Sequence, residues 1–327
     1  VGLALVQSGV SPSDPILQKI WKDQLTQPIF QSTTYTLGLQ LMLLDAMMHA
    51  PCGEAWPSPE AKEGKKEVLT WAQKKVDALV AGCDGGAWGY GSRAFDPKAV
   101  SYVVPEGKME IGSDALVRAA VSKAFYDYSN TQYAVLGLKA AALCGVRPKS
   151  EEMIWRLVIQ HFLRVQQAKG PSVALELFAE IPVSPPDFLK KGWEEAKTGA
   201  RTRRALARGW PYNAPPKGHQ PTSTASMTAA GLTALLVGSS ELKLKPAERE
   251  KVDEAVRDGL AWMQSEWAAH VFPPGKAVPG GYLLYGLERM GVLGSLRKVG
   301  GHDWYAEGAR LLLDRQQEGG AWSDGYE

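Results

Sequence analysis

This sequence has few cysteines, no long apolar runs and little net charge. Its 327 residues include Cys52, Cys83 and Cys144, which are too few for a disulfide framework and do not indicate a cellular compartment. No run approaches the roughly 18 apolar residues of a membrane helix. The formal net charge of +2 gives no general reason to expect a nucleic-acid partner. We therefore predict no transmembrane segment and no nucleic-acid binding.

The alternation of apolar and polar residues that marks half-buried strands is also absent. Instead, several segments open with small or polar residues and then run apolar on most faces, as buried helices do. They span 33–47, 129–145, 223–238 and 280–294. Each contains one Gly-Leu pair, namely Gly38-Leu39, Gly137-Leu138, Gly231-Leu232 and Gly286-Leu287, and Gly2-Leu3 is a candidate fifth. A glycine inside a helix costs about 1 kcal/mol against alanine, so we expect a close-packed neighbour or a cavity beside it.

Amphipathic, charged helices are predicted between the buried ones, because apolar residues recur there at spacings of three and four. They span 14–27, 65–82, 150–167, 250–269 and 303–317. The alternation predicts an all-α fold of helical hairpins. The hairpins either close into an α/α toroid, which is a double ring of helices, or stay open as a solenoid. We expect one domain over 1–327, with inserts near 91–113 and 171–210. The opening VGLALVQSGV reads as the end of a helix, so we expect the ring to be incomplete at both ends and the natural protein to begin upstream. The compartment stays open, cytoplasmic or exported.

Glycine-rich turns with a tryptophan follow the amphipathic helices. The last of them reads LLLDRQQEGGAW and contains Gln316, Gly320 and Trp322. This phrase resembles the Gln-Trp (QW) repeat of the terpenoid cyclase and protein prenyltransferase superfamily, and the chain looks like squalene-cyclase-like repeat proteins of planctomycete-type bacteria. Partial matches are Trp88 and Trp210.

The resemblance implies an α/α toroid with a central apolar cavity. It also implies that the Gln at the end of an outer helix and the Trp of the next turn tie adjacent hairpins together. We therefore expect Gln316 to bond backbone groups at the start of a neighbouring helix, with Trp322 covering that junction. Gln166 with Trp210 is a looser match, because the 171–210 insert separates them.

The stretch DYSNT, residues 127–131, opens one buried-type helix. In protonating terpenoid cyclases, the corresponding motif is Asp-x-Asp-Asp-Thr and its middle Asp delivers the proton. Asp127 and Thr131 match, but Ser129 and Asn130 replace the other two acids. A hydroxyl or amide is no strong acid near neutral pH, so we predict that DYSNT does not protonate polyprenes and that Ser129 or Asn130 instead caps a buried helix. The weak candidates for another catalytic acid are Asp127, Asp84, Asp114 and Asp45.

Tyrosines on the buried-type helices are candidates for the lining of the cavity, because aromatic ring faces attract cations. The predicted lining residues are Tyr35, Tyr133, Tyr282, Tyr285, Ser129 and Asn130. The alternative is that these tyrosines belong to an ordinary core.

A metal site is not predicted, and neither is a cofactor. Zinc needs three or four N, S or O ligands. The histidines are scattered, and His49-Ala-Pro-Cys52 is the one close His/Cys pair in the sequence. The second insert is basic and typical of a solvated face, at Arg201, Arg203, Arg204 and Arg208. The alternatives are contact with an anionic headgroup, a diphosphate or a partner chain, so peripheral membrane contact stays open.

Three functions are compatible with these patterns. The first is binding of an extended apolar, isoprenoid-like ligand, or of a partner segment, in the central cavity. The second is an active terpenoid cyclase or related enzyme that uses other acids. The third is a structural interaction module of a longer protein. Apolar lining alone names no ligand.

Overall fold

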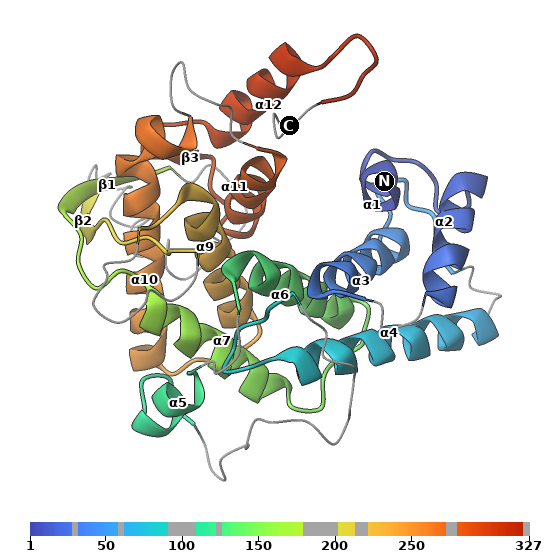
Figure 1. Cartoon of the computed structure of the whole chain (residues 1–327), viewed down its shortest axis with the longest axis horizontal. Coiled ribbons are helices and arrows are strands. Elements are labelled where there is room, and N and C mark those ends of the chain that lie inside the picture. Colours follow the sequence, from blue (N-terminus) through green and yellow to red (C-terminus); the bar gives the residue numbers. More distant parts are fainter. Residues whose placement is uncertain are drawn as a thin grey trace. The chain divides into compact units, whose positions relative to one another are not determined.

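A computed structural model describes residues 1–27, 32–57, 62–90, 109–121, 126–178, 202–212, 222–272 and 280–322 (Figure 1). These residues are mostly helical, as the sequence predicts. They belong to two compact units, Val1–Val158 and Ile159–Glu327. Each predicted helix, buried or amphipathic, corresponds to a helix of the structure.

The regular elements among the described residues of the first unit are all helices. Its elements are α1 (Gly2–Gln7), α2 (Pro15–Thr26), α3 (Thr34–Met48), α4 (Lys62–Gly82), α5 (Asp114–Ala119), α6 (Tyr128–Leu143) and α7 (Glu151–Val165), which runs on into the second unit. The buried-type helices α3 and α6 lie against each other, and α4 contacts both (Figure 1). Thr33 caps α3, as expected from the polar residues at its start. The cap of α6 is Asp127 and not Ser129 or Asn130, because the Asp127 carboxylate accepts the backbone N–H of Asn130 and the helix begins at Tyr128.

The mid-helix glycines Gly38 and Gly137 meet where α3 and α6 cross. A Cβ added to Gly137 would lie 2.6 Å from the Gly38 Cα, and one added to Gly38 would strike the carbonyl of Tyr133. The glycines therefore allow two helix backbones to touch. Gly231 plays a different part, because a Cβ there would lie 2.5 Å from the ring of Trp210. The Gly-Leu pairs thus mark close packing, against a backbone in one case and an indole in the other.

The second unit combines helices with a small sheet. Its elements are β1 (Ser172–Phe178), β2 (Thr202–Leu206), α9 (Ala225–Ser240), α10 (Pro246–Ser265), the π-helix η2 (Trp267–Val271), α11 (Gly281–Leu293), β3 (Lys298–Val299) and α12 (Trp304–Arg315). Helix α9 contacts α10 and α11, and α11 contacts α12. All of α9 is buried except Ser226 and Ser240, which agrees with its apolar sequence.

The prediction that strands are absent is wrong. An antiparallel sheet with the order β2-β1-β3 is present, and β1 pairs with β2 from Ser172↔Leu206 to Glu176↔Thr202. Both strands come from the predicted 171–210 insert. They contact α10, and Leu175 is fully buried. The sequence conceals these strands because they are short and because β2 carries adjacent arginines, which read as a solvated charged loop.

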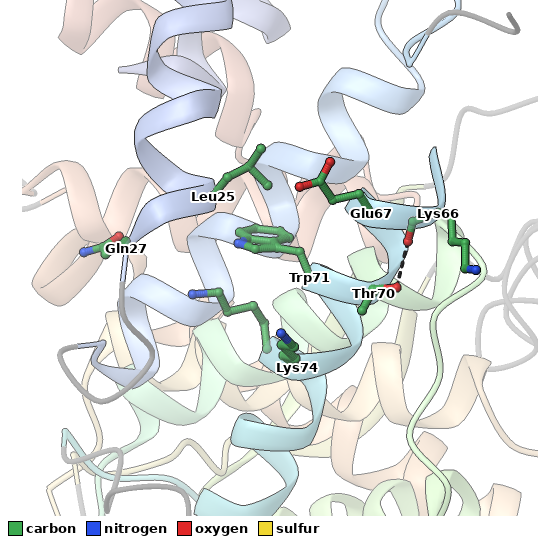
Figure 2. Close-up of a pocket in the computed structure, with 8 residues that line it drawn as sticks. Leu25, Gln27, Lys66, Glu67, Thr70, Trp71 and Lys74 are labelled. Carbon is green, nitrogen blue, oxygen red and sulfur yellow. Dashed lines mark hydrogen bonds between the residues drawn. The ribbon is translucent and has the colours of Figure 1, made fainter. Parts of the chain in front are cut away.

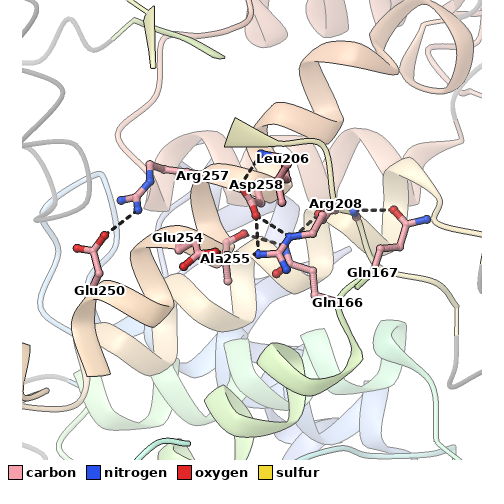
Figure 3. Close-up of polar contacts among 10 residues, drawn as sticks. Gln166, Gln167, Leu206, Arg208, Glu250, Glu254, Ala255, Arg257 and Asp258 are labelled. Atoms are coloured by element: carbon pink, nitrogen blue, oxygen red, sulfur yellow. Dashed lines mark hydrogen bonds and ion pairs between the residues drawn. The ribbon is translucent and has the colours of Figure 1, made fainter. Parts of the chain in front are cut away.

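The buried carboxylate of Asp258 on α10 anchors the insert where it returns to the helices. Its oxygens accept the backbone N–H of Leu206 at 2.9 Å and the Nε–H of Arg208 at 2.6 Å (Figure 3). Bonds of this kind to a charged group are stronger than neutral ones. Arg208 is therefore a structural ion-pair partner, although its neighbourhood in the sequence is that of a solvated basic segment.

A turn built around Trp88 joins the end of α4 to the start of α6. The indole N–H of Trp88 donates to the Leu79 carbonyl in the last turn of α4, at 2.7 Å. The backbone N–H of Trp88 donates to the Thr131 hydroxyl at 3.0 Å, and its carbonyl accepts the N–H of Asp127 at 3.2 Å. We call this arrangement a tryptophan turn. It ties the amphipathic helix to the next buried one.

A second tryptophan turn, around Trp210, repeats these contacts in the second unit. The indole N–H donates to the Phe162 carbonyl of α7 at 2.9 Å. The backbone N–H donates to the Thr228 hydroxyl at 3.2 Å, and the carbonyl accepts the N–H of Thr224, the N-cap of α9, at 3.2 Å. The repeat that the sequence suggests is thus a repeat of hydrogen bonds, even though a long insert interrupts the second copy.

The prediction that Gln316 bonds the start of a neighbouring helix is wrong, and a bond to a neighbouring helix is found instead at Gln166, which follows α7 and reaches the middle of α10. The amide of Gln166 donates to the Ala255 carbonyl of α10 at 2.9 Å (Figure 3). The amide of Gln316 donates to Gly320 in its own turn, at 3.1 Å. Trp322 is 50% exposed, whereas Trp88 and Trp210 are buried.

Candidate functional site

The DYSNT stretch forms a buried hydrogen-bond cluster at the start of α6. Asp127 is fully buried, and its Oδ1 accepts the Ser129 hydroxyl at 2.5 Å and the Asn130 backbone N–H at 2.8 Å. Its Oδ2 accepts the Asn130 side-chain amide at 2.8 Å. The carboxylate is therefore engaged as an acceptor, as in a helix N-cap, with donors on both oxygens. This arrangement suits a structural anchor.

Tyrosines of the first unit extend this cluster. The Tyr35 hydroxyl donates to the Ser129 Oγ at 2.5 Å, which in turn donates to Asp127. The rings of Tyr133 and Tyr90 lie 4.6 Å and 5.9 Å from that of Tyr35. Burial raises the pKa values of Tyr35 and Tyr133 above their usual range. These phenols therefore stay protonated and act as hydrogen-bond donors.

The predicted lining residues fall in both units. Tyr35, Tyr133, Ser129 and Asn130 belong to the first unit, and Tyr282 and Tyr285 lie on α11 of the second. Tyr282 and Tyr285 are half-buried, and the guanidinium of Arg289 lies 5.6 Å from the Tyr285 ring. The structure joins Tyr35, Ser129 and Asn130 to Asp127 through hydrogen bonds.

The other candidate acids lie in a turn or near a helix end. Asp84 exchanges backbone hydrogen bonds with Ala87 in the Trp88 turn. Asp114 is exposed in the first turn of α5. Asp45, near the end of α3, pairs with His49 at 2.8 Å. Beside Asp84, burial raises the pKa of the Cys83 thiol to about 12, so Cys83 is a protonated core residue.

A pocket of about 610 Å³ lies at the end of α2 and along α4 (Figure 2). We call it the Lys75 pocket. Its lining residues are Leu25, Gln27, Lys66, Glu67, Thr70, Trp71, Lys74 and Lys75. The indole N–H of Trp71 donates to the Gln24 carbonyl at 3.3 Å, which fixes the ring against α2. The buried amide of Gln40 on α3 donates to the side chains of Gln24 and Gln27 at 2.8 Å and 2.7 Å. The rim of the pocket is thus held by hydrogen bonds.

Lys75 is the unusual residue of this pocket. It is 1% exposed, and its Nζ is buried without a hydrogen-bond partner among the described residues. The ring of Trp71, 5.3 Å away, gives the ammonium a cation–π contact. Burial lowers the pKa of Lys75 below its usual range. A lysine is seldom fully buried unless paired, so this position is costly in the free protein.

Sequence reasoning missed Lys75. The run KKEVLTWAQKKVDALV contains several lysines, and nothing in the pattern separates the buried one from its exposed neighbours. The local signal is that Lys75 lies four residues after Trp71, a spacing that places both on one face of a helix. This spacing alone does not show that Lys75 is buried.

No protein-family model, curated protein or solved structure matches this chain. The described helices include none with the length and apolar character needed to cross a membrane.

Proposed function

We propose that this chain is a non-catalytic protein of helical hairpins that binds an amphiphilic ligand, with an isoprenoid-like apolar part and an anionic group, in the Lys75 pocket. The observation that carries the proposal is the ammonium of Lys75, buried in the pocket wall with no acceptor among the described residues. An anionic group would supply that acceptor. Charge-assisted hydrogen bonds are among the stronger ones in proteins.

The composition of the pocket supports an amphiphile. Leu25 and Trp71 offer apolar surface. Lys66, Lys74 and Lys75 outweigh the single acid Glu67, so the lining favours negative charge. A volume of about 610 Å³ falls within the range typical of small-molecule sites. This differs from the sequence-based hypothesis, which places the ligand in a central cavity.

The DYSNT cluster argues against the alternative of a protonating cyclase. A general acid must hold a proton within reach of its substrate. The Asp127 carboxylate is fully buried, and each of its oxygens already accepts a hydrogen bond from Ser129 or Asn130. In our proposal the cluster holds the start of α6 in place and takes no part in chemistry.

We also propose that the hairpins close into the double ring of the terpenoid cyclase superfamily. The support for this is the tryptophan turn, which ties an amphipathic helix to the next buried helix around both Trp88 and Trp210. Small-angle X-ray scattering tests the closure. A compact chain of this length has a radius of gyration of about 20 Å, and a clearly larger value would indicate an open solenoid.

Native mass spectrometry with solvent extraction tests the ligand-binding function. The purified protein is expected to carry an extractable amphiphile with an acidic group, and the Lys75→Met variant is expected to lose it. Lys65→Met is the matched control, because Lys65 is exposed on the same helix and does not line the pocket. An amphiphile retained equally by wild type and Lys75→Met would refute the assignment of this pocket.

A further inference from the structure

Three side chains with metal-ligand atoms meet at the C-terminal ends of α3 and α6. They are Asp45 in the last turn of α3, His49 at its C-cap and Cys144 at the C-cap of α6. One carboxylate oxygen, one ring nitrogen and the Sγ all lie within 4.8 Å of one another. Asp45 Oδ1 and His49 Nδ1 are 2.8 Å apart. A carboxylate, an imidazole and a thiol thus converge from two packed helices.

The electrostatics of this position favour a cation. A helix C-terminus carries a partial negative charge. The C-terminal ends of α3 and α6 meet beside the Asp45 carboxylate, and neither helix has a basic residue in its last turn. Burial raises the pKa of Asp45, and His49 and, more weakly, the Lys139 ammonium oppose that rise. The ends of both helices therefore lack the basic side chain that commonly offsets this charge.

The accessibility of the three residues suits an exchangeable ion. The side chains of His49 and Asp45 are 56% and 26% exposed, whereas Cys144 is buried. An ion can enter from the solvent side and keep a water molecule as its fourth ligand. Tetrahedral zinc with bonds of about 2.0–2.3 Å needs ligand atoms roughly 3.5 Å apart. The three donor atoms lie within 4.8 Å of one another, so small side-chain movements are needed on binding.

We propose that Asp45, His49 and Cys144 form a binding site for a divalent metal ion of the zinc class, independent of the Lys75 pocket. The mixed O, N and S donor set suits a borderline-soft ion such as Zn²⁺ or Co²⁺ over Mg²⁺ or Ca²⁺, which take oxygen ligands. Cys144 binds as the thiolate and releases its proton to water. The pair His49 and Cys52, which stand out in the sequence, is not the chelating pair, and Cys52 is exposed.

Titration of the metal-free protein with Co²⁺ tests the site. The expected spectrum has a thiolate-to-cobalt charge-transfer band and the strong visible bands of a tetrahedral ion, both lost when Zn²⁺ is added. The variants Cys144→Ser and His49→Ala should each lower Zn²⁺ affinity at least about tenfold, because even the loss of a residue that only supports a ligand costs that much. Because the His49 side chain is exposed, we expect His49→Ala to fold as the wild type does.

Cys52→Ser is the matched control, because it removes an exposed cysteine three residues after His49, and it should leave both spectrum and affinity unchanged. A wild-type spectrum without the thiolate band would overturn the proposal. So would a spectrum that survives in both Cys144→Ser and His49→Ala. The assay detects no amphiphile, so its outcome is independent of the function proposed for the Lys75 pocket.

Discussion

Gly38 and Gly137 touch across the crossing of α3 and α6, and a Cβ at Gly137 would lie 2.6 Å from the Gly38 Cα. That distance is far shorter than van der Waals contact, so any larger residue has to push the two helices apart. Each glycine weakens its own helix, but together they allow the backbones of α3 and α6 to touch.

We predict that Gly137→Ala destabilises the protein by about 1–3 kcal/mol, the usual cost of overpacking a core, even though alanine favours a helix by about 1 kcal/mol over glycine. Urea denaturation measures the difference. Gly308→Ala is the control, because Gly308 also lies inside a helix, α12, and a Cβ added there would lie at an ordinary contact distance of 3.6 Å from the Leu284 side chain. Equal or higher stability of Gly137→Ala would show that the helices can separate without cost.

The tryptophan turns make unequal contributions to stability in our account. Trp210 is fully buried and hydrogen-bonded through its indole, so Trp210→Ala should cost about 3–5 kcal/mol. Trp322 also donates its indole N–H, to Leu312 at 2.7 Å, but it is 50% exposed. We therefore expect Trp322→Ala to cost less than about 2 kcal/mol. Thermal and urea unfolding of the two variants compare these costs, and a larger loss for Trp322→Ala would refute the ranking.

No cyclisation is expected from the DYSNT cluster. Incubation of the protein with squalene, oxidosqualene or geranylgeranyl diphosphate should yield no cyclic product, because the Asp127 carboxylate is occupied by donors from Ser129 and Asn130. Gas chromatography with mass spectrometry measures the products. Turnover that disappears in Asp127→Asn would instead establish Asp127 as the acid and support the cyclase alternative.

The burial of Lys75 predicts a specific dependence of stability on pH. Burial lowers the pKa of Lys75 in the folded protein, so between the folded and unfolded pKa values the unfolded chain holds more protons. The free energy of unfolding therefore rises as pH rises through that window, by up to about 1.4 kcal/mol for each unit of pKa difference. Below the window, the cost of the buried charge is present in full.

The Lys75→Met variant removes this cost, so without ligand it should be at least as stable as wild type at neutral pH, and its advantage should shrink at alkaline pH. Denaturation of both proteins at several pH values isolates Lys75 from other groups that titrate there. Lys74→Met, at an exposed position, should follow wild type. A constant difference between Lys75→Met and wild type at all pH values would contradict a depressed pKa.

The helices were predictable because each class has its own pattern, apolar on most faces for α3, α6 and α9, and apolar on one face for α4 and α7. The features that were missed depend on contacts between distant residues. β1 and β2 are stable because they pair and lie on α10. Cys144 approaches Asp45 and His49 only because Gly38 and Gly137 let α3 and α6 pack closely. No local sequence pattern indicates that residues so far apart in the chain lie close together in the fold.

The candidate site shows the same limit. A helix start at DYSNT could be predicted, since polar residues at a helix start are a local signal, but the capping residue is Asp127 and not Ser129 or Asn130. The Lys75 pocket could not, because the side chains of Leu25 and Gln27 reach it from α2, which precedes α4 in the chain. The sequence places the lysines but does not distinguish the buried one.

Isothermal titration of the wild-type protein and Lys75→Met with geranylgeranyl diphosphate tests the central claim most directly. Geranylgeraniol and inorganic diphosphate serve as probes of the apolar and anionic parts alone. Our account predicts that the wild type binds the complete amphiphile more tightly than either part. It also predicts that Lys75→Met binds it roughly ten- to a hundredfold more weakly, the cost of losing a hydrogen bond to a charged group. Absence of binding to the wild type, or equal affinity in Lys75→Met, would contradict the account.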